Sequence, residues 1–353
     1  MTHIHMENTD RRGIISACTW ALDRIKIIDV WPEEEHLAQI TATDQQGGGC
    51  GYNLGVDIRK LDSSIPVEAI GLAGNDADGN FLLDQAASVG IDITQFRQIE
   101  GVQTSFTDVF TVGNTGRRTF FHHTGSNDHI NPDHFDLEKC KGRILHLGLL
   151  GVHAQMDSPW KSDANGWVTV IKNAHRLGIH SNMELVSIAK ERIREIAIPC
   201  IPYISSLIAN EYELSALAEC ELCVQDNQID EALFVKAASK LYELNNDGPL
   251  KLVVAHCPAV AFAMTKNGSV YTRRSFSVDP THIKSAVGAG DAFAAGMLYS
   301  MHENRDIDSA LELAHATAAA SLRSATTVGA VESIEKCLEF AKNASSPASQ
   351  PGF

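Results

Sequence analysis

Short strand-like runs alternate with helical segments along most of the chain, and this alternation constrains the fold more than any other feature. The expected core strands are Gly13–Thr19, Val67–Leu72, Ile144–Leu149, Ile179–Met183, Ser206–Ala209 and Leu252–Ala255. The expected helices are Gly51–Leu61, Gly79–Val89, Trp167–Leu177, Glu211–Glu219, Asp230–Leu244, Ala292–Met301 and Ile307–Ser324. Strands that alternate with helices form βαβ units. We therefore predict an α/β fold with a central, mainly parallel sheet and helices on both faces.

Two regions depart from this alternation. Arg24–Ile28 and His36–Thr43 are both strand-like and are separated by an acidic Pro-Glu-Glu-Glu segment. Ser105–Thr111 and Arg117–His123 flank Gly113-Asn114-Thr115-Gly116, a sequence typical of a hairpin turn. Because neither pair is accompanied by a helix, we predict a small separate β-sheet. The alternative is two ordinary surface hairpins.

Composition limits the classes of partner and the compartment. The net charge of −15 disfavours nucleic acid and anionic membrane, which both require a basic surface. No apolar run is long enough to span a bilayer, and Met1–Arg12 lacks the apolar core of a signal peptide. We expect a cytoplasmic protein in which the eight scattered cysteines are reduced. Residues 13–343 are predicted to form one domain between flexible tails at 1–12 and 344–353.

The segment Gly288-Ala289-Gly290-Asp291 opens an Ala-rich helix. A helix N-terminus carries unpaired N–H groups and the positive end of the helix dipole, and glycine allows an anion to approach closely. A carboxylate there would repel phosphate, which makes sense where a proton must be accepted beside the phosphate. The helix terminus is expected to lower the pKa of Asp291. The alternative is an ordinary helix cap.

Three further motifs precede this segment. Gly48-Gly49-Cys50-Gly51-Tyr52-Asn53 opens another predicted helix, Gly71–Gly79 has the pattern Gly-x-x-Gly-x-Asp-x-x-Gly, and Asn210-Glu211-Tyr212-Glu213 follows a predicted strand. Together the four motifs resemble, in order, those of the PfkB family of carbohydrate kinases, within the ribokinase-like superfamily. The resemblance covers roughly residues 13 to 340. It implies ATP-dependent phosphorylation of a primary hydroxyl on a sugar or a sugar-like molecule.

The resemblance also implies roles for individual residues. Asp291 would be the catalytic base, and Gly288, Ala289 and Gly290 would form the anion hole. Asp23, Gly48, Gly49 and Asn53 would bind the sugar. Asn210 and Glu213 would serve ATP and Mg²⁺, with Glu213 toward the metal. Gly288 and Gly290 would contact the nucleotide phosphates. The alternative for Asn210 is simple helix capping.

The family further implies a β lid, here at about 21–45 and 101–124, that covers the sugar and joins two chains in a homodimer. On this lid, Arg118 is interpreted as a solvated strand charge. Ser285-Ala286-Val287 departs from the family's Asp-Thr, so activation by the monovalent cation K⁺ stays open.

Two other functions stay open at this point. A nucleoside kinase on the same fold would need an aromatic slot, which Phe106, Phe110, Phe120 and Phe121 could supply. A catalytically degenerate sugar- or nucleotide-binding paralogue is favoured by the segment Ala255–Ala259, where the family has glycines that contact the nucleotide. The intact Gly-Ala-Gly-Asp favours an active kinase.

Overall fold

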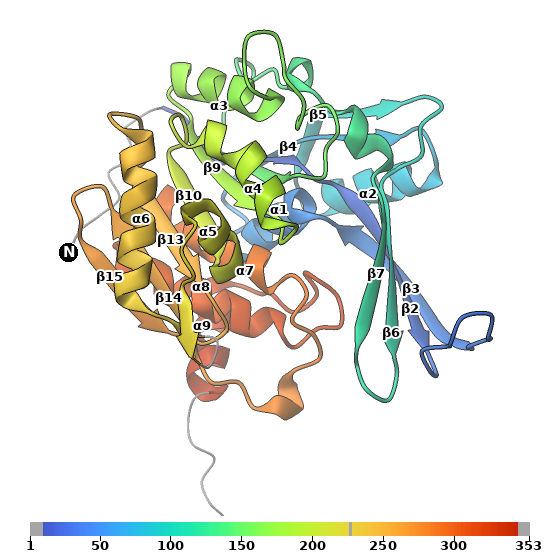
Figure 1. Ribbon diagram of the computed structural model, residues 1–353. Coiled ribbons are helices and arrows are strands. Elements are labelled where there is room, and N and C mark those ends of the chain that lie inside the picture. The colour runs from blue at the N-terminus through green and yellow to red at the C-terminus, as the bar shows by residue number, and fades with distance from the viewer. Residues whose placement is uncertain (1–9, 226–227, 345–353) are drawn as a thin grey trace, which may run out of the picture.

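A computed structural model describes residues 10–225 and 228–344 of the chain (Figure 1). Its centre is a nine-stranded sheet in the order β15-β14-β13-β10-β9-β8-β1-β4-β5. The strands are β1 (Ile14–Cys18), β4 (Val67–Gly74), β5 (Asp92–Ile99), β8 (Ile144–Leu150), β9 (His180–Leu185), β10 (Ser206–Asn210), β13 (Leu252–His256), β14 (Val260–Thr265) and β15 (Val270–Arg274). All neighbours from β13 to β5 pair in parallel, whereas β14 and β15 pair antiparallel at one edge. The predicted α/β fold with a mainly parallel sheet is confirmed.

Helices cover both faces of this sheet (Figure 1). One face packs in a hydrophobic core with α3 (Gly166–Arg176), α4 (Lys190–Ala197), α5 (Glu211–Ala218) and α6 (Glu231–Asn245). The other face packs with α1 (Cys50–Leu61), α2 (Ala77–Ser88), α7 (Ala289–His302), α8 (Ile307–Ser321) and α9 (Ile334–Ala344). The predicted strands and helices all form, but α4, α9, β5, β14 and β15 were not predicted.

The two regions that depart from the alternation form a separate four-stranded sheet in the order β3-β2-β6-β7. Its strands are β2 (Ala21–Ile28), β3 (Ile40–Gly48), β6 (Phe106–Val112) and β7 (Arg118–His123). In Figure 1 this sheet projects from the side of the main body. The predicted small sheet is therefore confirmed, although β3 continues into the glycines, with Gly48 opposite Ala21, where the sequence suggested an end at Thr43.

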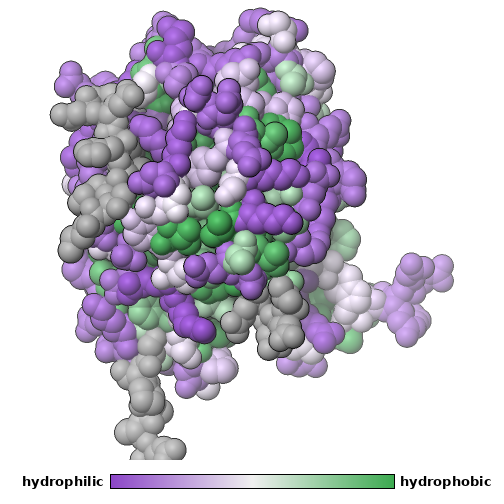
Figure 2. All heavy atoms as spheres, turned by 60° about the vertical axis from the view of Figure 1, so that its left-hand side comes forward, coloured by the Kyte–Doolittle hydropathy of each residue, from purple (hydrophilic) through white to green (hydrophobic). Residues whose placement is uncertain are grey.

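The remaining surface is largely polar on the face seen in Figure 2, where hydrophobic side chains show only in small groups. Among the described residues, no helix combines the length and the hydrophobicity that a membrane crossing requires. The predicted tails, apart from residues 10–12 and 344, lie outside the described residues. Arg11 and Arg12 hydrogen-bond to the carbonyl groups of Cys140 and Lys141, respectively.

Candidate active site

The start of α7 and the start of α1 meet at the carboxyl ends of the central strands. Gly288 precedes α7 with φ +83°, and a Cβ atom there would lie 2.7 Å from the Thr327 carbonyl oxygen, so glycine is required. Asp291 lies in the first turn of α7. Asn53 of α1 donates its amide N–H to Asp291 Oδ2 at 2.7 Å. The structure thus joins two motifs that are 238 residues apart in the sequence.

Asp291 faces a second carboxyl group, that of Glu184 at the end of β9. Burial, followed by the charge of Glu184, raises the pKa of Asp291 well above its ordinary value, and the Asn53 amide only partly opposes this. Burial likewise raises the pKa of Glu184 to about 7. The expectation of a lowered Asp291 pKa was therefore wrong, because burial beside a like charge outweighs the helix terminus.

Glu184 is supported from the neighbouring strand. His146 of β8 is fully buried, and its Nε2 lies 2.9 Å from Glu184 Oε2. Sequence reasoning missed both residues as parts of the site. The alternation of side chains along β9 could have indicated Glu184, because His180, Asn182 and Glu184 share one face and Glu184 is nearest the carboxyl end.

A polar row crosses one face of the four-stranded sheet and borders the same centre. Gln46, Asp23, Thr107 and His122 stand in register across its four strands. Asp23 is 9% exposed, and burial followed by the charge of Asp291 raises its pKa to about 7. A hydrogen bond from Thr107 partly opposes this effect. The charge of Asp291 contributes to the raised pKa of Asp23, so the two carboxyl groups lie close enough to repel each other.

The glycines at the end of β3 allow this close packing. A Cβ atom on Gly48 would lie 2.4 Å from Asp23 Oδ2. Gly49 precedes α1 as its N-cap residue. Both glycines therefore bring bare backbone next to Asp23 and the beginning of α1.

The loop after α8 connects the polar row to Asn53. Gln46 donates to Thr327 Oγ1 at 3.1 Å, and Thr327 donates to Asn53 Oδ1 at 2.8 Å. Arg118 donates to the Ala325 carbonyl oxygen at 2.9 Å. Arg118 lies on the Asp23 face of the sheet. Its cross-strand partner is Thr111, whose side chain points to the same face as that of Thr107 because side chains alternate along β6. Arg118 is half-buried, so its charge is partly solvated, as expected, and its side chain also reaches the main body.

Most of the predicted aromatic slot lies on the opposite face of the small sheet. Phe106, Phe110 and Phe121 pair with residues whose side chains alternate away from Asp23. Phe110 and Phe121 contact Trp31, and Phe106 lies under the Arg24 guanidinium. Only Phe120 lies on the Asp23 face. The four phenylalanines therefore do not enclose a common slot beside Asp23.

A mostly apolar cavity of about 280 Å³ borders the N-terminus of α7. Its lining includes Ala289 and Gly290 of the anion-hole motif, and the ring of His256 stacks on Phe293 with 4.6 Å between centroids. The changed segment Ala255–Ala259 thus contributes its His256, Cys257 and Pro258 to the cavity wall.

Asn210 also borders this cavity, whereas Glu213 lies one helical turn behind it. The two form a reciprocal capping box, in which the Asn210 side chain accepts from Glu213 N and the Glu213 carboxylate accepts from Asn210 N. Glu213 also accepts a hydrogen bond from Ser187 at 3.1 Å. Burial raises the pKa of Glu213.

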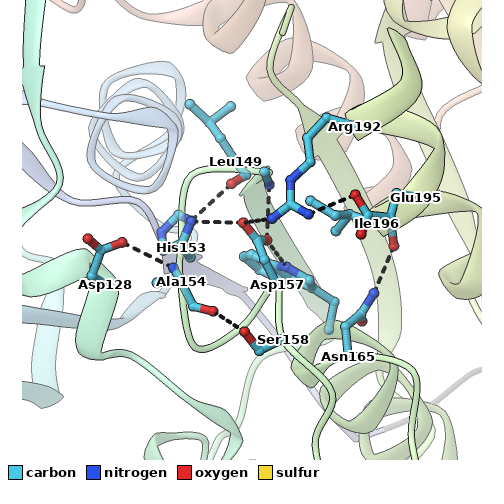
Figure 3. Close-up of polar contacts among 12 residues, drawn as sticks. Asp128, Leu149, His153, Ala154, Asp157, Ser158, Asn165, Arg192, Glu195 and Ile196 are labelled. Carbon is cyan, nitrogen blue, oxygen red and sulfur yellow. Dashed lines mark hydrogen bonds and ion pairs between the residues drawn. The ribbon is translucent and has the colours of Figure 1, made fainter. Parts of the chain in front are cut away.

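The loop after β8 forms a network of hydrogen bonds (Figure 3). Asp157 accepts hydrogen bonds from Gly151 N, His153 N and Trp167 Nε1. His153 in turn lies 2.9 Å from the Leu149 carbonyl oxygen and 3.2 Å from Thr19 Oγ1. Asp128, after β7, accepts from Ala154 N at 3.0 Å. This network ties the end of the small sheet to the main body.

Comparisons with known proteins identify the family of the chain. Residues 21–346 match the family described as pfkB family carbohydrate kinase. The chain is 26% identical over 311 residues to an ATP-dependent ribose-1-phosphate kinase of Halopiger xanaduensis, covering 86% of this chain and 91% of that protein. It is 22% identical over 324 residues to a deoxyribokinase of Salmonella typhi, covering 90% and 95%.

The fold is shared with solved structures. Ribokinase from Thermotoga maritima superposes with a TM-score of 0.75 at 19% identity, covering 94% of this chain and 100% of that one. Arabidopsis thaliana ribokinase complexed with ribose and ATP gives 0.75 at 17% identity, covering 94% and 99%. The predicted ribokinase-like fold is confirmed. The chain therefore belongs to the pfkB family of carbohydrate kinases, which are phosphotransferases that act on alcohol groups.

Proposed function

We propose that this protein transfers the γ-phosphoryl group of ATP to a primary hydroxyl of a sugar, with Asp291 as the base. One observation carries the proposal: Asn53 hydrogen-bonds to Asp291 in the first turn of α7, and Ala289 and Gly290 of the same turn line the apolar cavity. The sugar would contact Asp23, Asn53 and the Gly48-Gly49 backbone, and the adenine would occupy the apolar cavity.

Phosphoryl transfer depends mainly on positioning and on stabilisation of charge. In the proposed reaction, the backbone N–H groups of Gly290 and Asp291 bind the migrating phosphoryl group, because the first N–H groups of a helix have no partner within it. The Ala289 N–H donates to the Ala286 carbonyl oxygen at 3.2 Å in the structure and would join them after that bond is released. Asp291 accepts the hydroxyl proton. The Asn53 amide holds its carboxylate in place and favours the ionised form.

Mg²⁺ fits the acidic groups around the cavity. It prefers oxygen ligands and keeps several waters. The charge of Glu213 adds to burial in raising the pKa of Glu184, and Asn210, which lines the cavity, provides an amide oxygen. We propose that Glu213 and Asn210 hold the hydrated ion, which would supply charge neutralisation at the phosphates.

The small sheet is proposed to act as the lid and as the interface of a homodimer. On its face away from Asp23, Trp31, Phe110 and Phe121 form an aromatic cluster, with Trp31 and Phe121 45% and 51% exposed. An exposed aromatic cluster on a sheet favours association.

The test is ATP consumption with Mg²⁺ across sugars, sugar phosphates, sugar acids and nucleosides, with Asp291→Asn measured in parallel. We expect turnover of a sugar or sugar derivative that falls at least about a hundredfold in the variant. Preference for nucleosides would favour the rival nucleoside kinase. Absence of turnover, together with no effect of ATP on the melting temperature, would favour the degenerate paralogue and overturn the proposal.

A further inference from the structure

Three potential metal ligands converge next to Asp291. They are Cys50 at the start of α1, His146 on β8 and Glu184 on β9, and their ligand atoms all lie within 4.8 Å of one another. Cys50 and His146 are buried, whereas the Glu184 side chain is 14% exposed. An ion could therefore enter from the side of Glu184.

The contact between His146 and Glu184 is that of two neighbouring ligands rather than of a donor and an acceptor. His146 Nε2 and Glu184 Oε2 are 2.9 Å apart, yet neither atom has a hydrogen-bond partner within residues 10–225 and 228–344. Nitrogen and oxygen atoms bound to one divalent ion are separated by about 3 Å, because each lies about 2 Å from the metal. The lone pairs of His146 Nε2 and Glu184 Oε2 can therefore point to a single metal position.

The other ring nitrogen of His146 has a hydrogen-bond partner, as is usual for metal-binding histidines. Its Nδ1 lies 3.1 Å from the Asn182 amide, the amide is 3.0 Å from Ser206 Oγ, and Ser206 Oγ lies 2.9 Å from His180 Nε2. Rotating the Asn182 amide by a half-turn and reversing this chain lets Nδ1–H donate, which leaves the Nε2 lone pair for a metal.

We propose that Cys50, His146 and Glu184 bind a borderline divalent transition-metal ion such as Zn²⁺ or Co²⁺. A thiolate and an imidazole select such ions, whereas Mg²⁺ requires oxygen ligands. Binding releases the thiol proton of Cys50 to solvent. A water molecule would fill the fourth position of the tetrahedral set. Because two of the three ligands, Glu184 and His146, act electrostatically on Asp291, an ion bound between them would alter the surroundings of the proposed base, and we expect it to inhibit the kinase.

The binding test uses Co²⁺ and the full-length, reduced protein. We expect a thiolate-to-cobalt charge-transfer band with one equivalent of Co²⁺, which one equivalent of Zn²⁺ removes. Cys50→Ser should abolish the band. The Cys220→Ser/Cys223→Ser double variant is the matched control and should keep it, because those two cysteines are partly exposed and far along the chain from Cys50.

Absence of the band in the wild-type protein, or its persistence in Cys50→Ser, would overturn the site. If Cys50→Ser does not fold, Glu184→Gln replaces it. This variant keeps the thiol and should retain the band but bind Co²⁺ at least about tenfold more weakly. Unchanged affinity would equally overturn the assignment.

The inhibitory effect rests on the proposed function, whereas the cobalt spectrum does not. Zn²⁺ titrated into the MgATP-dependent reaction should inhibit the wild type and the double cysteine control alike. Cys50→Ser, normalised to its own rate without Zn²⁺, should need at least about tenfold more Zn²⁺. Equal sensitivity of Cys50→Ser would refute inhibition through this site, and a band in a protein without kinase activity would leave the site standing while the proposed function fails.

Discussion

Replacing Asp23 with asparagine should stabilise the ligand-free protein, and increasingly so as the pH rises. The pKa of Asp23 is raised from 3.8 to about 7, so the folded protein keeps this proton at pH values where the unfolded chain has released it. The wild type therefore loses stability between about pH 4 and pH 7. An asparagine side chain at this position cannot ionise, so the variant avoids this loss.

The magnitude follows from the two pKa values. At 1.36 kcal/mol for each pH unit, proton linkage should make Asp23→Asn more stable by about 2 kcal/mol at pH 5 and about 4 kcal/mol at pH 8, as upper values. The increase between the two pH values is the robust quantity, because it cancels pH-independent effects of the new amide on packing and hydrogen bonding.

Urea unfolding of both proteins at the two pH values measures this increase. Asp76→Asn is the matched control. Asp76 caps α2 and accepts hydrogen bonds from Gly79 and Thr104, which hold its pKa below the ordinary value. That variant should be destabilised by a similar amount at both pH values, because Asp76 is ionised throughout. If Asp23→Asn gained no stability between pH 5 and pH 8, the conclusion that Asp23 is a buried, repelled carboxyl would be refuted.

Three other outcomes are expected. Glu184→Gln should shift the rising limb of the pH–rate profile to lower pH, because it removes the like charge that raises the pKa of Asp291; an unchanged profile would contradict this coupling. Phe293→Ala should raise the KM for ATP by about tenfold or more while leaving the KM for the sugar within about twofold, since the ring lines only the apolar cavity. Replacing Trp31 and Phe121 together with serine should convert a dimer into monomers in sedimentation velocity, and a dimer that persists would place the interface elsewhere.

The sequence predicted the main features of the fold because local signals and long-range packing agree there. Each predicted core strand is an apolar run that became buried, and the hairpin signal at 113–116 correctly joined β6 to β7. Strands β14 and β15 were not predicted, because they follow β13 without an intervening helix. The start of α7 at Ala289 was predicted too late, because glycines in a sequence are typical of a loop.

Within the candidate site, the sequence indicated residues that lie in recognisable motifs. It could not indicate their electrostatics. The pKa of Asp291 depends on Glu184, which lies more than a hundred residues earlier and becomes its neighbour only when β9 is placed in the sheet. The contact of Arg118 could not be predicted for the same reason, because its partner, the Ala325 carbonyl, comes from a distant loop.

The measurement that most directly tests the central claim is phosphorus NMR of the product formed from the preferred substrate and ATP, with the initial rates of wild type and Asp291→Asn. The account predicts a phosphate ester whose phosphorus couples to the protons of a CH₂ group, formed at least about a hundredfold more slowly by the variant. A phosphate on a ring hydroxyl or an anomeric carbon, or a variant within a few-fold of the wild-type rate, would contradict it.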